Sequence, residues 1–258
     1  MRKAKILWAV LTVLAFAAGP ALALPTVDEI LAKIAKAAAE LNSFSSDGRI
    51  SVTAGPGKGV LDITEAGVIL RKDGKVVYKS CTTAKGTVTG PNGEQATVER
   101  KSVSDGKFRW EETRIPEFGV RTVVKENADA PDRMTGLRAD LDSLSAFGEM
   151  KEMYTLRLTG EDTLNGEKVW LLEGDFNEEY LKKNPKAESL IPMMKTVKVW
   201  VNQQDLYWRK MVDYDPDGHQ TIIVEVDNVK LNGKVDEALF DYTPPEGAQV
   251  HDMTEAGE

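Results

Sequence analysis

Residues 197–201 read Val-Lys-Val-Trp-Val, residues 222–226 read Ile-Ile-Val-Glu-Val, and Asp217-Gly218 lies between them. Apolar side chains at alternate positions predict β-strands with one buried face and one solvated face. An Asp-Gly dipeptide supplies the positive φ angles that a tight hairpin turn requires. These two stretches therefore predict a pair of strands in an antiparallel sheet.

The same pattern recurs along most of the chain. Further alternations of β-branched, aromatic and leucine side chains are Ile50 and Val52; Val76 and Tyr78; Phe108 and Trp110; and Tyr154, Leu156 and Leu158. Parallel strands need long crossover connections, which this close spacing does not allow, so we expect an antiparallel meander. The dipeptides of the turn-forming type are Asp47-Gly48, Asp73-Gly74, Asn92-Gly93, Asp105-Gly106, Asn165-Gly166, Asp217-Gly218 and Asn232-Gly233.

Helices are predicted at three places. Thr26 and Glu29 have the spacing of a capping box, and the apolar positions that follow to Leu41 recur at helical intervals. Residues 138–147 and 178–194 show shorter helical patterns. We expect all three to cover the apolar face of the sheet, which gives one mainly β domain with helices.

The first 23 residues are predicted to be a cleavable signal peptide. Arg2, Lys3 and Lys5 precede the apolar run 6–18. Thirteen helical residues rise roughly 20 Å, which is short of a ~30 Å hydrocarbon core. Cleavage after Ala23 would leave a single domain, residues 24–258, in the periplasm or outside the cell.

Composition excludes several classes of function. The chain has 33 basic and 41 acidic side chains, a net charge of −8, one cysteine and two histidines. Such an acidic protein has no broad cationic surface, so nucleic acid and anionic lipid headgroups are poor candidate partners. The few Cys and His residues argue against a metal cage, and no cofactor or metal is expected. Cys81 is interpreted as a buried structural thiol, with a reactive thiol as the alternative.

The sequence shows no clear catalytic motif. Asp213 to Gly218 resembles the start of a calcium loop, but the twelfth position is Val224 instead of glutamate, which favours an acidic turn. Carboxylates are too plentiful for one acid–base pair to stand out, and no Gly-x-Ser-x-Gly motif occurs. His219 and His251 lie in polar segments, so we expect the protein not to be an enzyme.

The C-terminal stretch from Ala238 to Asp252, with Phe240-Asp241-Tyr242 followed by Thr243-Pro244-Pro245-Glu246-Gly247, resembles the ending of LolA-type outer-membrane lipoprotein carriers. Three further segments resemble that family in the same order. They are the capped helix leading into Leu41-Asn42-Ser43-Phe44, the segment Ser104 to Trp110, and the hairpin from Val199 to Gly218.

The resemblance implies an open antiparallel half-barrel, an incomplete β-barrel covered by helices, whose apolar cavity holds acyl chains of lipoproteins or lipids. It also implies a monomeric periplasmic carrier that meets an inner-membrane export transporter and an outer-membrane acceptor. Inward positions of such a barrel alternate along each strand. The residues we predict to line the cavity are Ile50, Val52, Phe108, Trp110, Leu156, Leu158, Trp170, Leu172, Val197, Val199, Val201, Ile222, Val224 and Val226.

The sequence is also compatible with two other functions. A periplasmic sensory or regulatory module could use the same half-barrel to bind a partner protein without moving cargo. A secreted hydrolase would need catalytic residues that the sequence does not reveal. For each predicted lining residue, ordinary core packing is the competing interpretation.

Overall fold

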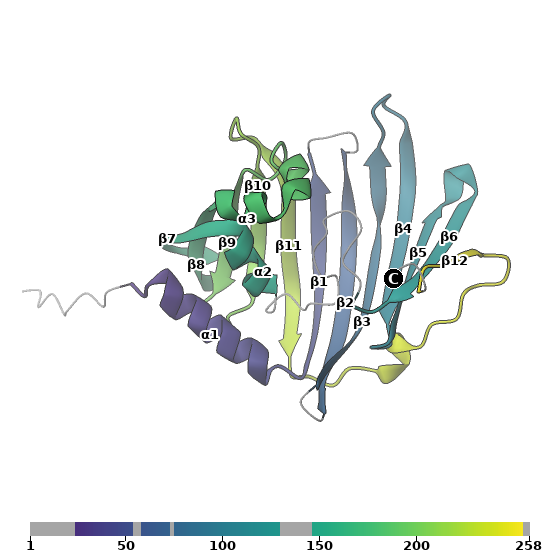
Figure 1. Cartoon of the computed structure of the whole chain (residues 1–258), viewed down its shortest axis with the longest axis horizontal. Helices are drawn as coiled ribbons and strands as arrows, with labels where there is room; N and C mark the ends of the chain where they lie inside the picture. The colour runs from purple at the N-terminus through teal and green to yellow at the C-terminus, as the bar shows by residue number, and fades with distance from the viewer. Residues whose placement is uncertain (1–23, 54–57, 73–74, 130–145, 255–258) are drawn as a thin grey trace, which may run out of the picture.

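In a computed structural model of the protein, the described residues are 24–53, 58–72, 75–129 and 146–254 (Figure 1). The predicted signal peptide, the Asp73-Gly74 turn and all but the last two residues of the predicted helix 138–147 lie outside these ranges. Within the same ranges, no helix has the length and apolar composition needed to cross a membrane.

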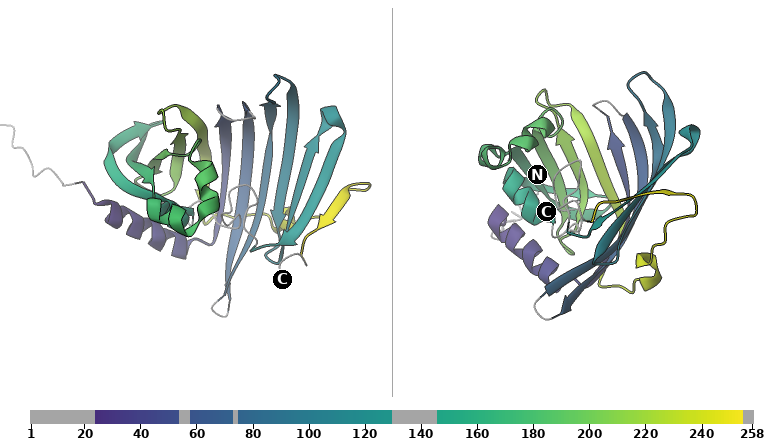
Figure 2. Two further views of the ribbon diagram at one scale, coloured as in Figure 1. Left: turned by 45° about the horizontal axis from the view of Figure 1, so that its top comes forward. Right: turned by 45° about the vertical axis from the view of Figure 1, so that its right-hand side comes forward.

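Twelve strands form one sheet in the order β12-β6-β5-β4-β3-β2-β1-β11-β10-β9-β8-β7. Two antiparallel meanders, β1 to β6 and β7 to β11, are joined where β1 pairs with β11. The sheet curves but its end strands do not pair with each other, so it is an open half-barrel (Figures 1 and 2). The strands are β1 (Ser43–Val52), β2 (Lys58–Lys72), β3 (Lys75–Thr89), β4 (Gln95–Ser104), β5 (Phe108–Ile115), β6 (Val120–Asn127), β7 (Tyr154–Leu164), β8 (Glu167–Phe176), β9 (Thr196–Asn202), β10 (Trp208–Tyr214), β11 (Gln220–Leu231) and β12 (Gln249–Asp252).

Most of the predicted turn dipeptides lie between strands. Gly93, Gly106, Gly166 and Gly218 all have positive φ, as the hairpin interpretation requires. The prediction at Asp47-Gly48 is wrong, because both residues lie inside β1. A β-bulge shifts the β1–β11 register there, and a Cβ on Gly48 would lie 2.9 Å from the Glu225 carbonyl oxygen. Glycine is thus needed at this position for the close approach of two backbones.

Asn232-Gly233 does not close a hairpin either. Asn232 has a φ of 56° and ends β11, and its side-chain oxygen accepts a hydrogen bond of 2.7 Å from the Asn42 amide. The chain then leaves the sheet toward the 3₁₀ helix η3 (Glu237–Phe240). The left-handed backbone conformation of Asn232 thus directs the chain away from the sheet after β11.

Helix α1 (Val27–Glu40) begins as predicted. The Thr26 hydroxyl accepts from the Glu29 amide, and the Glu29 carboxylate accepts from the Thr26 amide, so the capping box is complete. Ile30, Leu31 and Ile34 are the buried side chains of its apolar face. The amphipathic pattern therefore fixes which side of α1 lies on the sheet.

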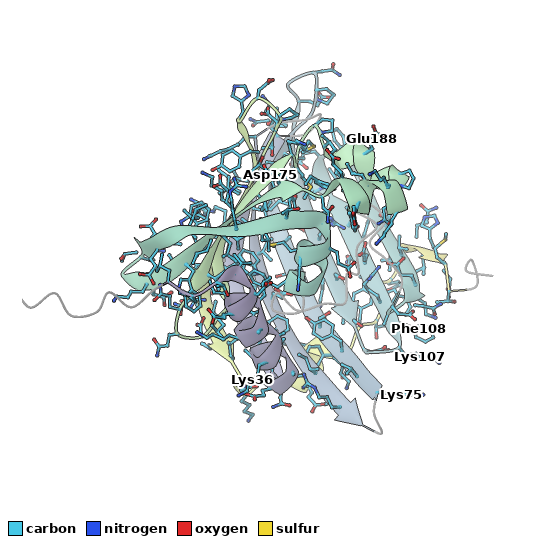
Figure 3. The ribbon with its side chains drawn as sticks, turned by 60° about the vertical axis from the view of Figure 1, so that its left-hand side comes forward. Lys36, Lys75, Lys107, Phe108, Asp175 and Glu188 are labelled. Atoms are coloured by element: carbon cyan, nitrogen blue, oxygen red, sulfur yellow. The ribbon has the colours of Figure 1, made fainter. Side chains whose placement is uncertain are left out.

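The helices lie on one face of the sheet, which we call the inner face; the opposite side is the outer face. Helices α2 (Ala146–Met153) and α3 (Glu178–Lys183), with the 3₁₀ helix η2 (Pro185–Leu190), cover β7 to β10 together with α1 (Figures 1 and 2). Lys36 on α1 and Glu188 on η2 are exposed on the solvent side of this helical cover (Figure 3).

The C-terminal segment packs on the outer face. Phe240 is 2% exposed and packs with Cys81 and Val103. The ring centroids of Tyr242 and Trp110 lie 5.7 Å apart. The last strand, β12, then pairs with β6 in parallel, whereas every other neighbouring pair is antiparallel. The antiparallel prediction therefore fails only at this edge, where the chain returns after crossing the sheet (Figure 2).

Candidate functional site: an apolar row across the inner face

One apolar residue from each of seven neighbouring strands forms a continuous row on the inner face. Directly paired residues of adjacent strands point to the same side of a sheet. Neighbouring strands lie about 4.8 Å apart, so six steps extend over roughly 29 Å. The apolar row, from β2 to β7, consists of Leu61, Ile50, Val224, Met211, Val199, Leu172 and Leu158.

Burial changes along the row. Val199 and Leu172 are fully buried in the core beneath the helical cover. Leu61, Ile50, Val224 and Met211 are half-buried, and so is Leu158 at the β7 end, where it packs against the same core. Val199 and Leu172 therefore act as core in this structure, while the stretch from Leu61 to Met211, which we call the accessible part of the row, retains some apolar surface that faces solvent.

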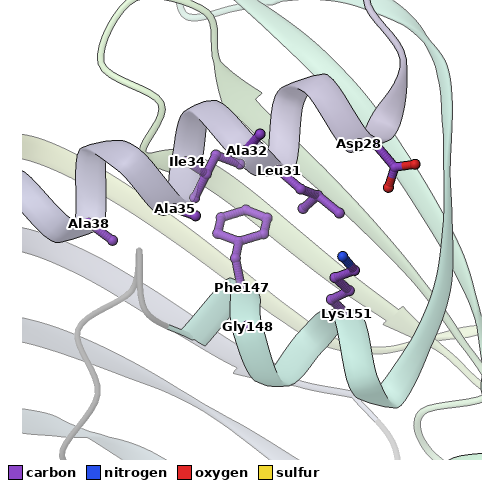
Figure 4. Close-up of a pocket in the computed structure, with 9 residues that line it drawn as sticks. All are labelled: Asp28, Leu31, Ala32, Ile34, Ala35, Ala38, Phe147, Gly148 and Lys151. Atoms are coloured by element: carbon purple, nitrogen blue, oxygen red, sulfur yellow. The ribbon is translucent and has the colours of Figure 1, made fainter.

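An apolar groove of about 610 Å³ separates α1 from α2. The Phe147 ring points from α2 toward Leu31, Ile34 and Ala35 of α1, and Lys151 lies at the same groove (Figure 4). The volume falls within the range of about 300–1,000 Å³ typical of small-molecule sites. The groove divides the cover into two parts.

A second, smaller depression of about 250 Å³ lies at the accessible end of the row. It combines apolar and polar side chains. The lining residues are Ile50, Leu61, Ile63, Thr82, Ala84, Arg100, Lys101, Ser102 and Glu111. We call it the trough.

Twelve of the fourteen predicted lining residues share the inner face. Their strand partners place them there. Trp170 and Leu172 point inward because they pair with Val201 and Val199. The twelve are Ile50, Val52, Leu156, Leu158, Trp170, Leu172, Val197, Val199, Val201, Ile222, Val224 and Val226.

Phe108 and Trp110 lie on the outer face. Trp110 pairs with Val103, whose side chain packs with Cys81 and Phe240 under the C-terminal segment. The inner-face position of β5 between them belongs to Arg109, which is 2% exposed. The aromatic pair thus covers the outer face and does not adjoin the apolar row.

A buried carboxylic acid interrupts the inner face beside the row. Asp213 is 1% exposed and pairs with Ile222 and Val197 on the neighbouring strands. The Tyr154 hydroxyl donates to its carboxylate over 3.4 Å. Burial raises the pKa of Asp213 to about 7, against a smaller opposing effect of the Tyr154 hydrogen bond.

The Tyr154 phenol is affected in the same direction. Burial, followed by the nearby Asp213 carboxylate, raises the pKa of Tyr154 above its ordinary value. Sequence reasoning missed this pair because Asp213 was interpreted as part of an acidic turn. Asp213 lies in an alternating strand pattern, at a position that shares its side of the strand with apolar residues. That alternation is the signal that identifies Asp213 as inward-facing.

Charged side chains on β4 to β6 were also missed. Arg100 and Glu111 approach within 3.5 Å, Arg109 and Glu111 within 3.6 Å, and Arg109 donates to Glu126 over 2.9 Å. All four side chains point to the inner face by their strand pairing. The sheet therefore changes from apolar to charged between β2 and β5.

Helix α1 is held at its C-terminus by a residue from β2. Arg71 donates to the carbonyl oxygens of Ala38, at 2.9 Å, and Leu41, at 2.5 Å. A helix end leaves carbonyl groups without partners, and a cation there interacts favourably with the helix dipole. Arg71 thus connects the cover to the open half of the sheet.

The acidic turn predicted at Asp213 to Gly218 begins only at Asp215, because Asp213 and Tyr214 lie in β10, and it connects β10 to β11. Asp215 accepts hydrogen bonds from the amides of Asp217 and His219, and its other oxygen lies 3.1 Å from the His219 ring. These contacts explain the turn by local hydrogen bonding. His219 and His251 are both exposed.

Comparisons with known proteins concern the fold alone. No protein-family model and no curated protein matches the chain. Among solved structures, LprF from Mycobacterium bovis is similar with 15% identity and a TM-score of 0.47, over 81% of this chain and 93% of that one.

A LolA superfamily protein from Nitrosomonas europaea is similar with 13% identity and a TM-score of 0.29, over 85% of this chain and 99% of that one. The complex of MucA and MucB from Pseudomonas aeruginosa contains a chain that is similar with 14% identity and a TM-score of 0.39. That match covers 83% of this chain and 60% of the other. The solved structures that this open, helix-covered half-barrel resembles thus include LolA-like folds.

Proposed function

We propose that the protein is an exported carrier that binds the acyl chains of lipoproteins or lipids along the apolar row. The observation that carries this proposal is the row itself, which continues from half-buried residues on β2 and β1 to fully buried residues on β8 and β9. A ligand that enters at the accessible end can therefore extend under the cover without leaving apolar surface.

The dimensions suit a single acyl chain. From Leu61 to Met211 the row crosses three strand spacings, or roughly 14 Å. One leaflet of a bilayer has a hydrocarbon thickness of about half of ~30 Å. The accessible part of the row is thus about as long as one chain in a membrane.

The energy of transfer supports the same class of ligand. Moving a methylene group from water to an apolar site is favourable by about 0.8 kcal/mol, so a chain of ~15 methylenes gains on the order of 12 kcal/mol. A carrier must supply a comparable apolar surface away from the membrane. The half-buried row provides part of it, and displacement of the cover would provide the rest.

Loading would require the helical cover to move. Val199 and Leu172 are fully buried beneath it, so a chain can reach them only if α1 and α2 separate from the sheet. The groove between α1 and α2 already divides the cover, so we propose that the cover parts there. The membrane partners would then act by favouring the open or the closed cover.

A vesicle transfer assay with the chain 24–258 tests this proposal. Donor vesicles carry a fluorescent diacyl lipid and a quencher, and acceptor vesicles carry neither. We expect the rate of transfer to increase with protein concentration. Absence of any increase, with no soluble complex of protein and lipid, would contradict carriage; a soluble complex without transfer would favour a sensory module.

Two adjacent residues on β11 provide a matched control. Val224 faces inward and Ile223 outward, and both are half-buried. Val224→Glu should abolish transfer, because a charge would lie in the middle of the row, whereas Ile223→Glu should leave most of it. Equal loss in both variants would argue that the inner face is not the binding surface.

A further inference from the structure

A second row of paired residues leads from the core to an arginine. Val226, Gly48, Ile63, Ala84 and Arg100 are successive partners on β11, β1, β2, β3 and β4. All five positions face inward, and their side chains change from the apolar Val226, Ile63 and Ala84 to the Arg100 guanidinium, with Gly48 contributing none. The boundary lies inside the trough, which Ile63, Ala84 and Arg100 line together.

Arg100 is loosely held. Its side chain is 48% exposed, and it lies 3.5 Å from Glu111, which is longer than a good charge-assisted hydrogen bond. Glu111 also lies 3.6 Å from Arg109. The Glu111 carboxylate would therefore remain close to one guanidinium if Arg100 turned to another anion.

The neighbouring ion pair of Arg109 and Glu126 is closer and more deeply buried than that of Arg100 and Glu111. Arg109 donates through Nε to Glu126 over 2.9 Å, and both side chains are almost fully buried. Arg109 is thus committed to a protein carboxylate. Arg100, by contrast, combines solvent access, a weak partner and a place in the trough beside Ile63 and Ala84.

We propose that the trough is a head-group site, in which Arg100 binds the anionic group, carboxylate or phosphate, of an amphiphile whose chain lies along the apolar surface toward β11. This inference rests on the proposed function and adds the chemical class of the ligand. A guanidinium presents a planar fork that matches both anions, and the hydroxyl groups of Thr82 and Ser102 line the same trough. A ligand with a neutral head would leave the Arg100 interaction unused.

Competition binding with the chain 24–258 tests the head-group site. The neutral fluorophore 1-aminoanthracene serves as the displaced probe, and palmitate, hexadecyl phosphate and methyl palmitate serve as competitors. We expect at least one of the two anions to bind about tenfold more tightly than the ester, because charge-assisted hydrogen bonds are the stronger kind. The two anionic competitors distinguish a fatty-acid source from a phospholipid source.

Substitutions at two residues of the trough, Arg100 and Glu111, have opposite expected effects. Arg100→Gln should remove the tenfold preference while methyl palmitate binds as before, and Arg100→Lys should retain part of it. Glu111→Gln should increase the preference, since the competing carboxylate is removed. Circular dichroism and thermal unfolding verify that each variant is folded.

Arg114 provides the matched control. It lies on the neighbouring strand β5, its side chain is 53% exposed, and it pairs with Glu99 at 3.3 Å, but it faces outward. Arg114→Gln should leave all three affinities unchanged. Binding of all three competitors with no change in Arg100→Gln would overturn the head-group site, whereas failure of all three to displace the probe would overturn the proposed function as well.

Discussion

The Tyr154 hydroxyl and the Asp213 carboxylate join β7 to β10 across 3.4 Å beneath the helical cover. The same hydroxyl lies 3.5 Å from the Met194 carbonyl, at the end of the segment that follows η2. Thr221 donates to the carbonyls of Met193 and Asp213. This cluster therefore ties the cover to the sheet at a buried titratable group.

Asp213 makes the stability of the protein dependent on pH. Its folded pKa of about 7 lies above the ordinary value of 3.8, so the folded state binds the proton more tightly than the unfolded state. The resulting stabilisation is fully present below about pH 4 and is lost as the pH rises toward 7. A shift of about three units corresponds to at most roughly 4 kcal/mol.

Asp213→Asn should remove this dependence, because the amide does not ionise. The measurement is the free energy of unfolding in urea between pH 4 and pH 8 for both proteins. We expect the difference between them to change by a few kcal/mol across this range, with the wild type losing stability as the pH rises. Parallel curves would show that folding does not raise the pKa of Asp213.

The fully buried and the half-buried parts of the apolar row should respond differently to truncation. Leu172→Ala removes a fully buried side chain and should cost about 2–5 kcal/mol of stability. Ile50→Ala, at a half-buried position, should cost about 1 kcal/mol or less and should weaken acyl-chain binding instead. Chemical denaturation and probe titration measure the two effects separately, and an equal loss of stability would mean that Ile50 is ordinary core.

Arg71 should control local opening of α1. Arg71→Gln removes the cation at the helix C-terminus. We expect faster amide hydrogen exchange in residues 34–41, because the stability of this part of the helix falls by about 1 kcal/mol. Exchange in β8 and β9 should stay unchanged. Uniform acceleration across the sheet would indicate global destabilisation and not a loosened cover.

Cys81 should be unreactive in the folded protein. It is buried under Phe240, and desolvation raises the pKa of its thiol. Native protein at pH 8 should react slowly with a thiol reagent, and Phe240→Ala should accelerate the reaction at least tenfold. A fast reaction in the wild type would contradict the packing of the C-terminal segment on the outer face.

Local patterns in the sequence predict much of this fold for physical reasons. The capping box at Thr26 and the alternation in residues 197–201 depend only on near neighbours, and both predictions are confirmed. The alternation of side chains along each strand also predicts that most of the lining candidates share one face. It does not predict the face of Phe108 and Trp110, because the outer face of β5 is covered by a segment more than a hundred residues later in the chain.

Other features depend on pairing that no local pattern reveals. Gly48 permits a close approach of the β11 backbone next to a bulge, and β12 pairs in parallel with β6 only after crossing the sheet. Arg100 lies beside Ala84 through the register of β3 and β4. Charged residues on a strand are normally interpreted as solvated, so their place in an apolar trough becomes visible only in three dimensions.

Photocrosslinking tests whether acyl chains bind along the inner face. The chain 24–258 is loaded with a fatty acid that carries a diazirine in its chain and is irradiated, and the adducts are mapped by peptide mass spectrometry. We expect adducts on inner-face residues of the accessible part of the row, Leu61, Ile50, Val224 and Met211, and their loss on competition with palmitate. Adducts concentrated on the outer face, at Phe108 and Trp110, or no saturable adduct at all, would contradict binding along the inner face.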